Sequence, residues 1–145
     1  MKKEIRTEIV IQAPAEKIWK ILTDFDSYPN WNPFIKSITG QVVQNSIFKV
    51  VIEAPDSKPM TFKPKVLVFE EEKEFRWLGH FLFRGLFDGD HKFELIDHKN
   101  GTTTFVQSEQ FSGVLVPFLR KMLDTKTVKG FDLMNKKIKE LAEKD

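Results

Sequence analysis

Three polar side chains that can carry chemistry fall on the last two strands predicted from the sequence. Alternation over residues 105–111 places Gln107 and Glu109 on the same side as two phenylalanines, and alternation over 91–95 places His91 beside apolar neighbours. Because side chains on a strand alternate with a period of two, inward-facing apolar residues bring these three polar groups inward as well. A turn centred on Asn100 would set His91 opposite Glu109.

An imidazole and a carboxylate that face one hollow can bind each other, hydrogen-bond a ligand, or act as a general acid and base. A buried carboxylate needs a partner, since burial without one is costly. Two plainer alternatives are a satisfied polar pair near the end of the sheet and a bulge that turns Glu109 out to solvent. We assign no catalytic set, and His91 and Glu109 are the candidates.

Other chemistries have little support in the residues. The chain has no cysteine and only three histidines, which are predicted on different strand faces or in a turn. No HExxH motif, paired-carboxylate metal motif or glycine-rich phosphate loop is present. Ser108 and Ser112 fall on the face opposite Glu109, which argues against a catalytic triad. We therefore expect no metal site and no cofactor.

The surrounding pattern predicts the elements that position these groups. Residues 4–12 alternate as a strand, a helix begins at Pro14, and the turn-rich residues 26–33 hold a short second helix. Six further strands follow with short connections, which is typical of an antiparallel meander. The expected fold is α+β, with one curved seven-stranded antiparallel sheet wrapped around a long C-terminal helix.

That helix is predicted over residues 117–142. Its apolar residues recur in steps of three, four, and seven or eight, which puts them on one face. They are Leu119, Leu123, Phe131, Met134, Ile138 and Leu141, with the small Thr127 and Gly130 between them. A glycine inside a helix costs about 1 kcal/mol relative to alanine, so we expect Gly130 to mark a close approach to the sheet or a bend that opens a cavity.

Composition limits the class of protein. The 145 residues predict one domain over 1–145, and 23 Lys+Arg against 21 Asp+Glu leave a net charge of +2, too balanced to favour nucleic acid. No stretch is apolar enough to insert stably in a membrane, and Met1 to Arg6 lead into no apolar run, so we expect a soluble cytoplasmic protein. The sequence sets no oligomeric state.

The 14 Phe against one Tyr suit a dry interior. A set of aromatic and polar residues on the inward faces of the strands and helix is predicted to line a ligand cavity, although a solid core is the alternative for each apolar one. The predicted lining residues are Phe62, Trp77, Phe81, His91, Phe93, Phe105, Gln107, Glu109, Phe131 and Met134. The apolar connection 81–87, with Phe118 and Met122, is predicted to form an entrance, to touch a membrane or protein, or to cover the end of the fold.

Several local sequences in this order resemble the START/SRPBCC superfamily, the helix-grip proteins that include the birch-pollen allergen, and in particular its bacterial polyketide cyclase/dehydrase-like branch. They are IQAPAEKIW at 11–19, YPNWNPF at 28–34, FRWLG at 75–79, FDGDHKF at 87–93, EQFSG at 109–113 and GFDLMN at 130–135. The resemblance implies the helix-grip fold and binding of an apolar ligand such as a lipid, polyketide, sterol or aromatic hormone. It carries over no catalytic residue.

Three functions are consistent with the sequence. The first is reversible binding of a small hydrophobic or amphipathic ligand between the sheet and the C-terminal helix. The second is a cyclase-, dehydratase- or hydrolase-like enzyme that uses the same cavity, with both His91 and Glu109 pointing into it. The third, suggested by branches of the superfamily that regulate chaperone ATPases, is a protein-interaction module with a filled interior and an exposed apolar patch around Phe83 and Leu86.

Overall fold

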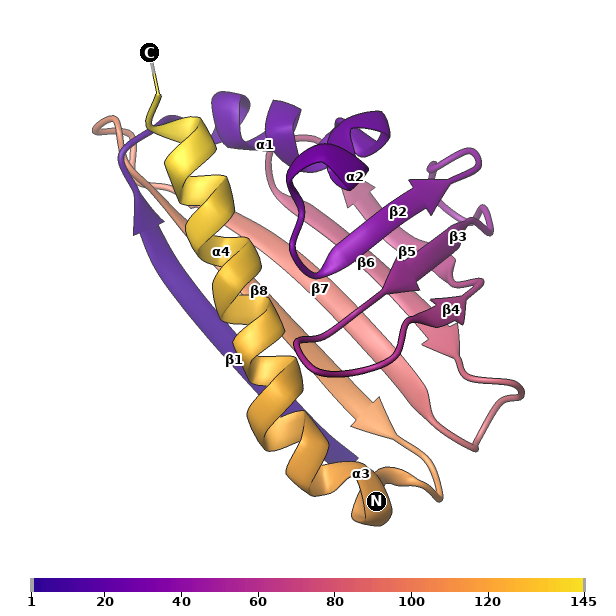
Figure 1. Cartoon of the computed structure of the whole chain (residues 1–145). Helices are drawn as coiled ribbons and strands as arrows, with labels where there is room; N and C mark the ends of the chain where they lie inside the picture. The colour runs from indigo at the N-terminus through magenta and orange to yellow at the C-terminus, as the bar shows by residue number, and fades with distance from the viewer. Residues whose placement is uncertain (1, 145) are drawn as a thin grey trace.

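The computed structural model describes residues 2–144 and has a helix-grip architecture (Figure 1). In chain order the elements are β1 (Lys2–Ile11), α1 (Ala15–Thr23), a 3-10 turn (Phe25–Ser27), α2 (Tyr28–Trp31), β2 (Ile35–Thr39), β3 (Lys49–Ile52), β4 (Met60–Phe62), β5 (Lys65–Glu70), β6 (Glu74–His80), β7 (Asp88–Asp97), β8 (Thr103–Ser112), α3 (Val116–Met122), a π-helical segment (Leu123–Thr127) and α4 (Val128–Ala142).

The strands form two antiparallel sheets, one of five strands in the order β1-β8-β7-β6-β5 and one of three in the order β2-β3-β4. The α+β helix-grip prediction is confirmed, but the single seven-stranded sheet is replaced by eight strands in two sheets. Pro64 accounts for the extra strand, because a proline cannot donate to the strand ladder and the chain on either side of it divides into β4 and β5. A bridge between Ile47 and Lys65 still joins the two sheets.

A bulge in β5 shifts which of its side chains face the core. Val66 pairs with Trp77, but Val68 pairs with Arg76 and Phe69 with Phe75, so the register shifts by one residue between Val66 and Val68. Val68 therefore shares the outer face with Arg76, and Phe69 joins the core in its place.

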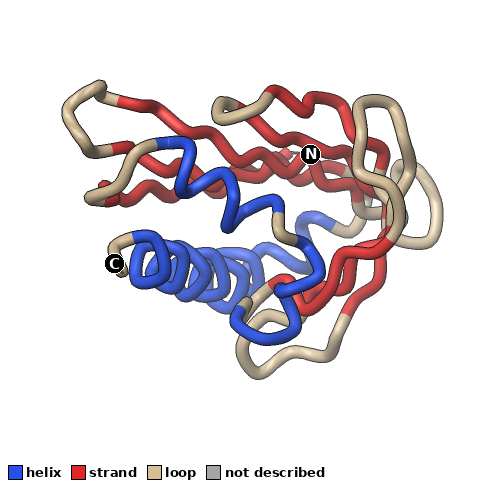
Figure 2. Tube along the Cα trace, turned by 90° about the horizontal axis from the view of Figure 1, so that it is seen from above, coloured by secondary structure: helices blue, strands red, loops and turns tan. Residues whose placement is uncertain are grey.

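The C-terminal helix lies along one face of the five-stranded sheet, on β1 and β8, while the three-stranded sheet lies in front of β6 and β7 (Figures 1 and 2). The helix is not uniformly α-helical, because the π-helical segment Leu123–Thr127 separates α3 from α4. This wider turn keeps both Leu123 and Thr127 buried. At the far end Ala142, rather than Leu141, takes the buried position.

Gly130 lies where α4 passes close to Phe34. A Cβ at this position would lie 2.4 Å from Cδ1 of Phe34, the buried ring that precedes β2. The predicted close approach is therefore present, but the contact is with the segment leading into the smaller sheet. The Phe34 and Phe131 rings meet edge to face beside it, with centroids 5.3 Å apart.

Candidate functional site

A hollow lies between the two sheets and the π-helical segment. It has two neighbouring compartments, with cavity volumes of about 50 and 20 Å³, that share five lining residues. Its walls are mainly apolar, and the mouth lies beside the connection between β3 and β4. The lining residues are Phe34, Ile52, Ala54, Ser57, Lys58, Met60, Phe62, Trp77, Gly79, Phe87, Gly89, Glu109, Phe111, Met122, Leu123 and Thr127.

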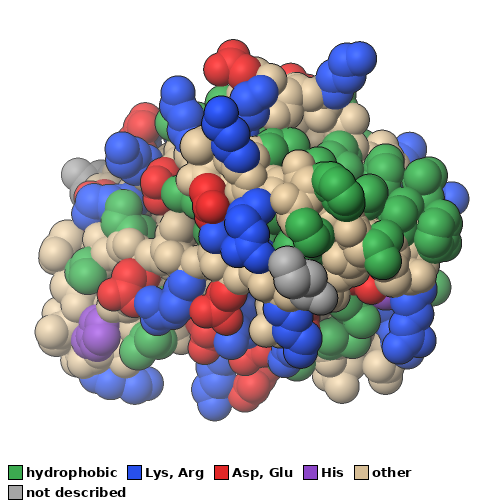
Figure 3. Space-filling model, turned by 90° about the horizontal axis from the view of Figure 1, so that it is seen from below, with side chains coloured by type: hydrophobic (Ala, Val, Ile, Leu, Met, Phe, Trp, Pro, Cys, Tyr) green, Lys and Arg blue, Asp and Glu red, His purple; other side chains and the backbone are tan. Residues whose placement is uncertain are grey.

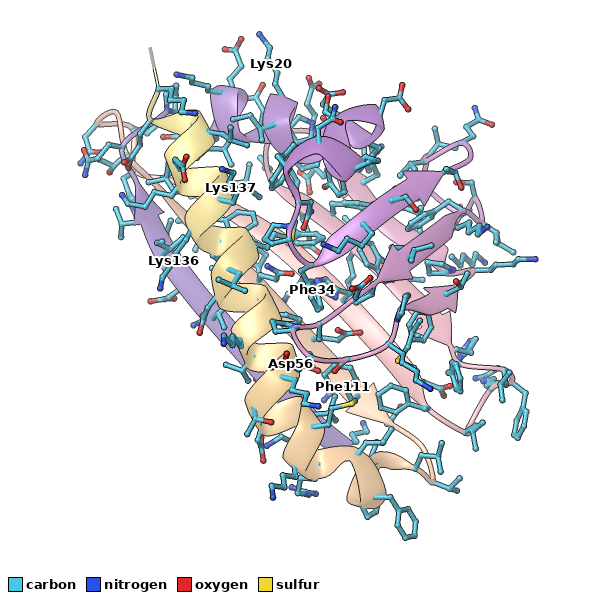
Figure 4. The ribbon with its side chains drawn as sticks, in the orientation of Figure 1. Lys20, Phe34, Asp56, Phe111, Lys136 and Lys137 are labelled. Carbon is cyan, nitrogen blue, oxygen red and sulfur yellow. The ribbon has the colours of Figure 1, made fainter. Side chains whose placement is uncertain are left out.

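The connection beside the mouth is tied to the C-terminal helix by a hydrogen bond. The Lys126 ammonium donates a hydrogen bond of 3.0 Å to the backbone oxygen of Asp56 in the β3–β4 connection. Figure 4 shows Asp56 close to the C-terminal helix, with Phe34 above it and Phe111 beneath it on β8. Met60 and Met122 lie at this side, and methionine side chains adapt readily to a change of shape.

Glu109 is the acidic side chain in the wall of both compartments, and its side chain is 10% exposed. The β7–β8 register sets His91 opposite Glu109 and Phe93 opposite Gln107 without a shift, as the turn at Asn100 predicted. His91 Nδ1 lies 2.9 Å from Glu109 Oε1. Glu109 therefore points inward to a partner, and the bulge that would have turned it to solvent is absent from β7 and β8.

His91 lies behind Glu109 and away from the hollow. Its side chain is fully buried, and its ring is enclosed by three aromatic rings whose centroids lie 4.7 Å (Trp77), 4.7 Å (Phe93) and 5.1 Å (Phe131) away. The predicted arrangement in which both members of the pair face a ligand is therefore corrected: Glu109 lines the hollow, and His91 supports it.

A chain of hydrogen bonds continues from His91 across the core to β1. His91 Nε2 lies 3.0 Å from Gln107 Oε1, Gln107 Nε2 donates to Asn135 Oδ1 over 2.8 Å, and Asn135 Nδ2 donates to Thr7 Oγ1 over 2.8 Å. Thr7 Oγ1 in turn donates to the backbone oxygen of Gln107 over 2.9 Å. Asn135 comes from α4, so the chain ties the helix to the sheet.

The last bond fixes the direction of all the others, because a backbone carbonyl can only accept. Thr7 must donate to it and hence accept from Asn135, whose oxygen then accepts from Gln107. Gln107 Oε1 is left to accept, so His91 Nε2 carries a proton. One further proton then lies between His91 Nδ1 and Glu109 Oε1, and in either position Glu109 Oε2 is a hydrogen-bond acceptor.

Gly89 makes room for that acceptor. A Cβ at Gly89 would lie 2.2 Å from Glu109 Oε2, whereas a Cβ at its cross-strand partner Gly79 would meet its nearest neighbour at 3.4 Å. The wall of the hollow is thus kept free of a side chain where the carboxyl group lies.

We expect Gly89→Ala to lower the free energy of unfolding by about 1–3 kcal/mol, because the new methyl group displaces the Glu109 carboxyl from His91. Gly79→Ala is the matched control on the facing strand and should not lower the free energy of unfolding, since its Cβ would make only ordinary contacts. Urea denaturation of both variants measures the difference. Equal stabilities would contradict the packing of Glu109 over Gly89.

The structure separates the predicted lining residues into two groups. Phe62 and Glu109 line the hollow, Trp77 reaches its smaller compartment, and Phe81 is half-buried against Phe62. The remaining side chains are fully buried in a packed core and do not line the hollow, because aromatic rings fill the space beside His91. These are His91, Phe93, Phe105, Gln107, Phe131 and Met134.

The lining predicted from the sequence omits much of the wall of the larger compartment. Met60, Phe87, Phe111 and Thr127 were not included, although Phe111 shares the predicted inward face of Glu109 and Thr127 lies in the helix stripe. Phe34 carried no periodic signal, since it precedes β2 in a turn-rich segment.

Two sheets packed around a long C-terminal helix define the class as the helix-grip fold. The profile of the polyketide cyclase/dehydrase and lipid transport family matches residues 2–143, so the chain belongs to that family. No curated protein gives a significant match by sequence.

Solved structures share the fold at low sequence identity. The Zhui aromatase/cyclase from Streptomyces sp. R1128 has a TM-score of 0.79 at 11% identity, covering 99% of this chain and 94% of that one. Norcoclaurine synthase from Thalictrum flavum, solved with dopamine and hydroxybenzaldehyde, has a TM-score of 0.73 at 16% identity over 100% and 90% of the two chains. A START superfamily protein from Mycobacterium smegmatis has a TM-score of 0.71 at 18% identity over 95% and 98%.

Proposed function

We propose that this protein binds a small, largely apolar molecule that carries one hydrogen-bond donor, with the donor on Glu109 Oε2. The observation that carries the proposal is the direction of the buried hydrogen-bond chain, which leaves Oε2 as an acceptor in an apolar wall. Burial of apolar surface would supply most of the affinity, at about 25 cal/mol per Å². The family to which the chain belongs, and the aromatic compounds bound to norcoclaurine synthase, support a guest of this kind.

The hollow must widen to admit such a guest. Its compartments have volumes of about 50 and 20 Å³, whereas pockets for small ligands have volumes of about 300–1,000 Å³. The movable parts are on the outer side: the β3–β4 connection is held to the helix by the Lys126–Asp56 bond, and two methionines lie beside it. The packed core around His91 is not expected to move.

Fluorescence titration with 2-naphthol and with naphthalene tests the proposal. The two probes share one ring system, and only the first carries a donor. We expect 2-naphthol to bind about three- to tenfold more tightly, since a net hydrogen bond contributes about 0.5–1.5 kcal/mol. Native mass spectrometry of the purified protein should also show a co-purified small molecule. The proposal fails if neither probe binds, or if naphthalene binds as tightly as 2-naphthol.

A second candidate function is acid–base catalysis on the bound guest. It is favoured by the proton held between His91 and Glu109, which lets Glu109 give or take a proton at the wall of the hollow. The probe is 2-tetralone in D₂O, whose α-hydrogens exchange when a base removes them. Faster exchange with the wild type than with Glu109→Gln supports catalysis. Equal rates would contradict catalysis and leave binding as the proposed function.

A further inference from the structure

One end of the molecule exposes apolar side chains from two connections. Leu82 and Phe83 lie between β6 and β7 and are 79% and 62% exposed, and Val114 and Phe118 lie after β8 and are 67% and 82% exposed. We call these four residues the apolar tip. Seen from this end, Figure 3 shows hydrophobic side chains gathered into a patch. Isolated exposed apolar residues are ordinary, but a contiguous group marks an interaction surface.

Backbone hydrogen bonds hold the two connections side by side. The Val114 amide donates to the Gly85 carbonyl and the Leu115 amide to the Leu86 carbonyl, each over 3.0 Å. Leu82 has a φ of +66°, in a tight turn closed by a bond of 2.8 Å from the Phe83 amide to the Phe81 carbonyl. Glycine or asparagine would suit this backbone better. A leucine here presents an apolar side chain to solvent in a conformation that does not favour it.

The two segments that form the tip carry cations and no acids. Residues 81–87 and 113–123 contain no Asp or Glu, but they include Arg84, Arg120 and Lys121, all exposed. Asp88, the next acid after the first segment, is engaged by His80 Nδ1 at 2.8 Å and by the Gly85 amide at 3.1 Å. Asp124, the next acid after the second segment, forms an ion pair with Lys3. The tip therefore combines apolar side chains with a cationic rim.

We propose that this tip docks on the surface of an anionic lipid bilayer. Large apolar side chains enter the boundary between headgroups and acyl chains, and Lys and Arg beside them are attracted to anionic headgroups. A second copy of the chain fits less well, because a two-fold contact would bring the same cations together. No helix among residues 2–144 is long and apolar enough to cross a membrane. Met122, one helical turn after Phe118, lines the hollow, so docking would place its mouth near the bilayer.

Vesicle flotation tests the proposal, with vesicles of phosphatidylcholine alone and of equal parts phosphatidylcholine and phosphatidylglycerol. The wild type should float with the anionic vesicles, less at high salt, and hardly with the neutral ones. The double variant F83S/F118S should bind the anionic vesicles at least about tenfold more weakly than the wild type. V10S/I96S is the matched control, since Val10 and Ile96 are also exposed but lie at the other end of the sheet. Circular dichroism confirms that each variant is folded.

Absence of wild-type binding, equal binding of F83S/F118S, an equal loss in V10S/I96S, or no preference for anionic vesicles would each overturn the proposal. So would a concentration-dependent dimer that F83S/F118S abolishes, which would make the tip an interface between copies. The proposal does not rest on the function proposed for the hollow. In vesicle-free solution F83S/F118S should bind 2-naphthol as the wild type does, so either proposal can fail without the other.

Discussion

Replacing Gln107 by leucine should lower the free energy of unfolding by about 2–5 kcal/mol, because it strands the His91 Nε2 proton and the Asn135 oxygen, and each unpaired buried group costs about 1–3 kcal/mol. Gln107 is fully buried and joins His91 on β7 to Asn135 on α4. Leucine has a similar size, so the loss comes from hydrogen bonding more than from volume. Urea denaturation gives the difference in stability.

Gln110→Leu is the matched control, since Gln110 is exposed on the same strand. It should change stability by no more than about 0.5 kcal/mol. The double variant Q107L/N135L also removes the Asn135 oxygen that Gln107→Leu leaves unpaired. Its decrease in the free energy of unfolding should therefore be smaller than the sum of the decreases in the two single variants. Equal stabilities for Q107L and Q110L would show that the buried chain does not hold the helix to the sheet.

Glu109→Met should weaken 2-naphthol binding by about tenfold or more, because the hydroxyl group of the probe is then buried without an acceptor. Methionine keeps the unbranched shape, so the affinity for naphthalene should stay within about twofold or rise, as expected from burial alone. Fluorescence titration of both probes measures the two effects in one variant. The outcome shows whether Glu109 recognises a polar group or only fills the wall.

Glu109→Gln refines this comparison. The glutamine amide can donate to His91 Nδ1 and still present an oxygen to the hollow. Glu109→Gln should therefore lose less affinity for 2-naphthol than Glu109→Met does. Equal weakening of both probes in Glu109→Met would indicate a collapsed hollow, and unchanged 2-naphthol binding would show that the hydroxyl group lies elsewhere.

The central pair was predictable from the sequence for a local reason. Period-two alternation and a short turn at Asn100-Gly101 leave few ways to pair the last two strands, and each residue's partner follows from the turn. His91 opposite Glu109 and Phe93 opposite Gln107 are accordingly found as expected. The long amphipathic helix was predictable in the same way, from the apolar residues that recur along one of its faces.

The position of the hollow was not predictable, because it depends on how side chains from distant segments fill space. Alternation shows that Trp77, Phe93 and Phe131 face inward but not that their rings pack around His91. Gly130 signalled a close approach, but its partner Phe34 lies about a hundred residues earlier in the chain. The β5 bulge, which moves Val68 outward, leaves no signal in the alternation of apolar residues there.

The most direct test of the account is a crystal structure of the protein with 2-naphthol. We predict that the ring system lies between Phe62, Phe111 and Met122, with its hydroxyl oxygen within hydrogen-bond distance of Glu109 Oε2 and the β3–β4 connection displaced from the helix. A ring system bound outside the hollow, or inside it with the hydroxyl group turned away from Glu109 toward the mouth, would contradict the account.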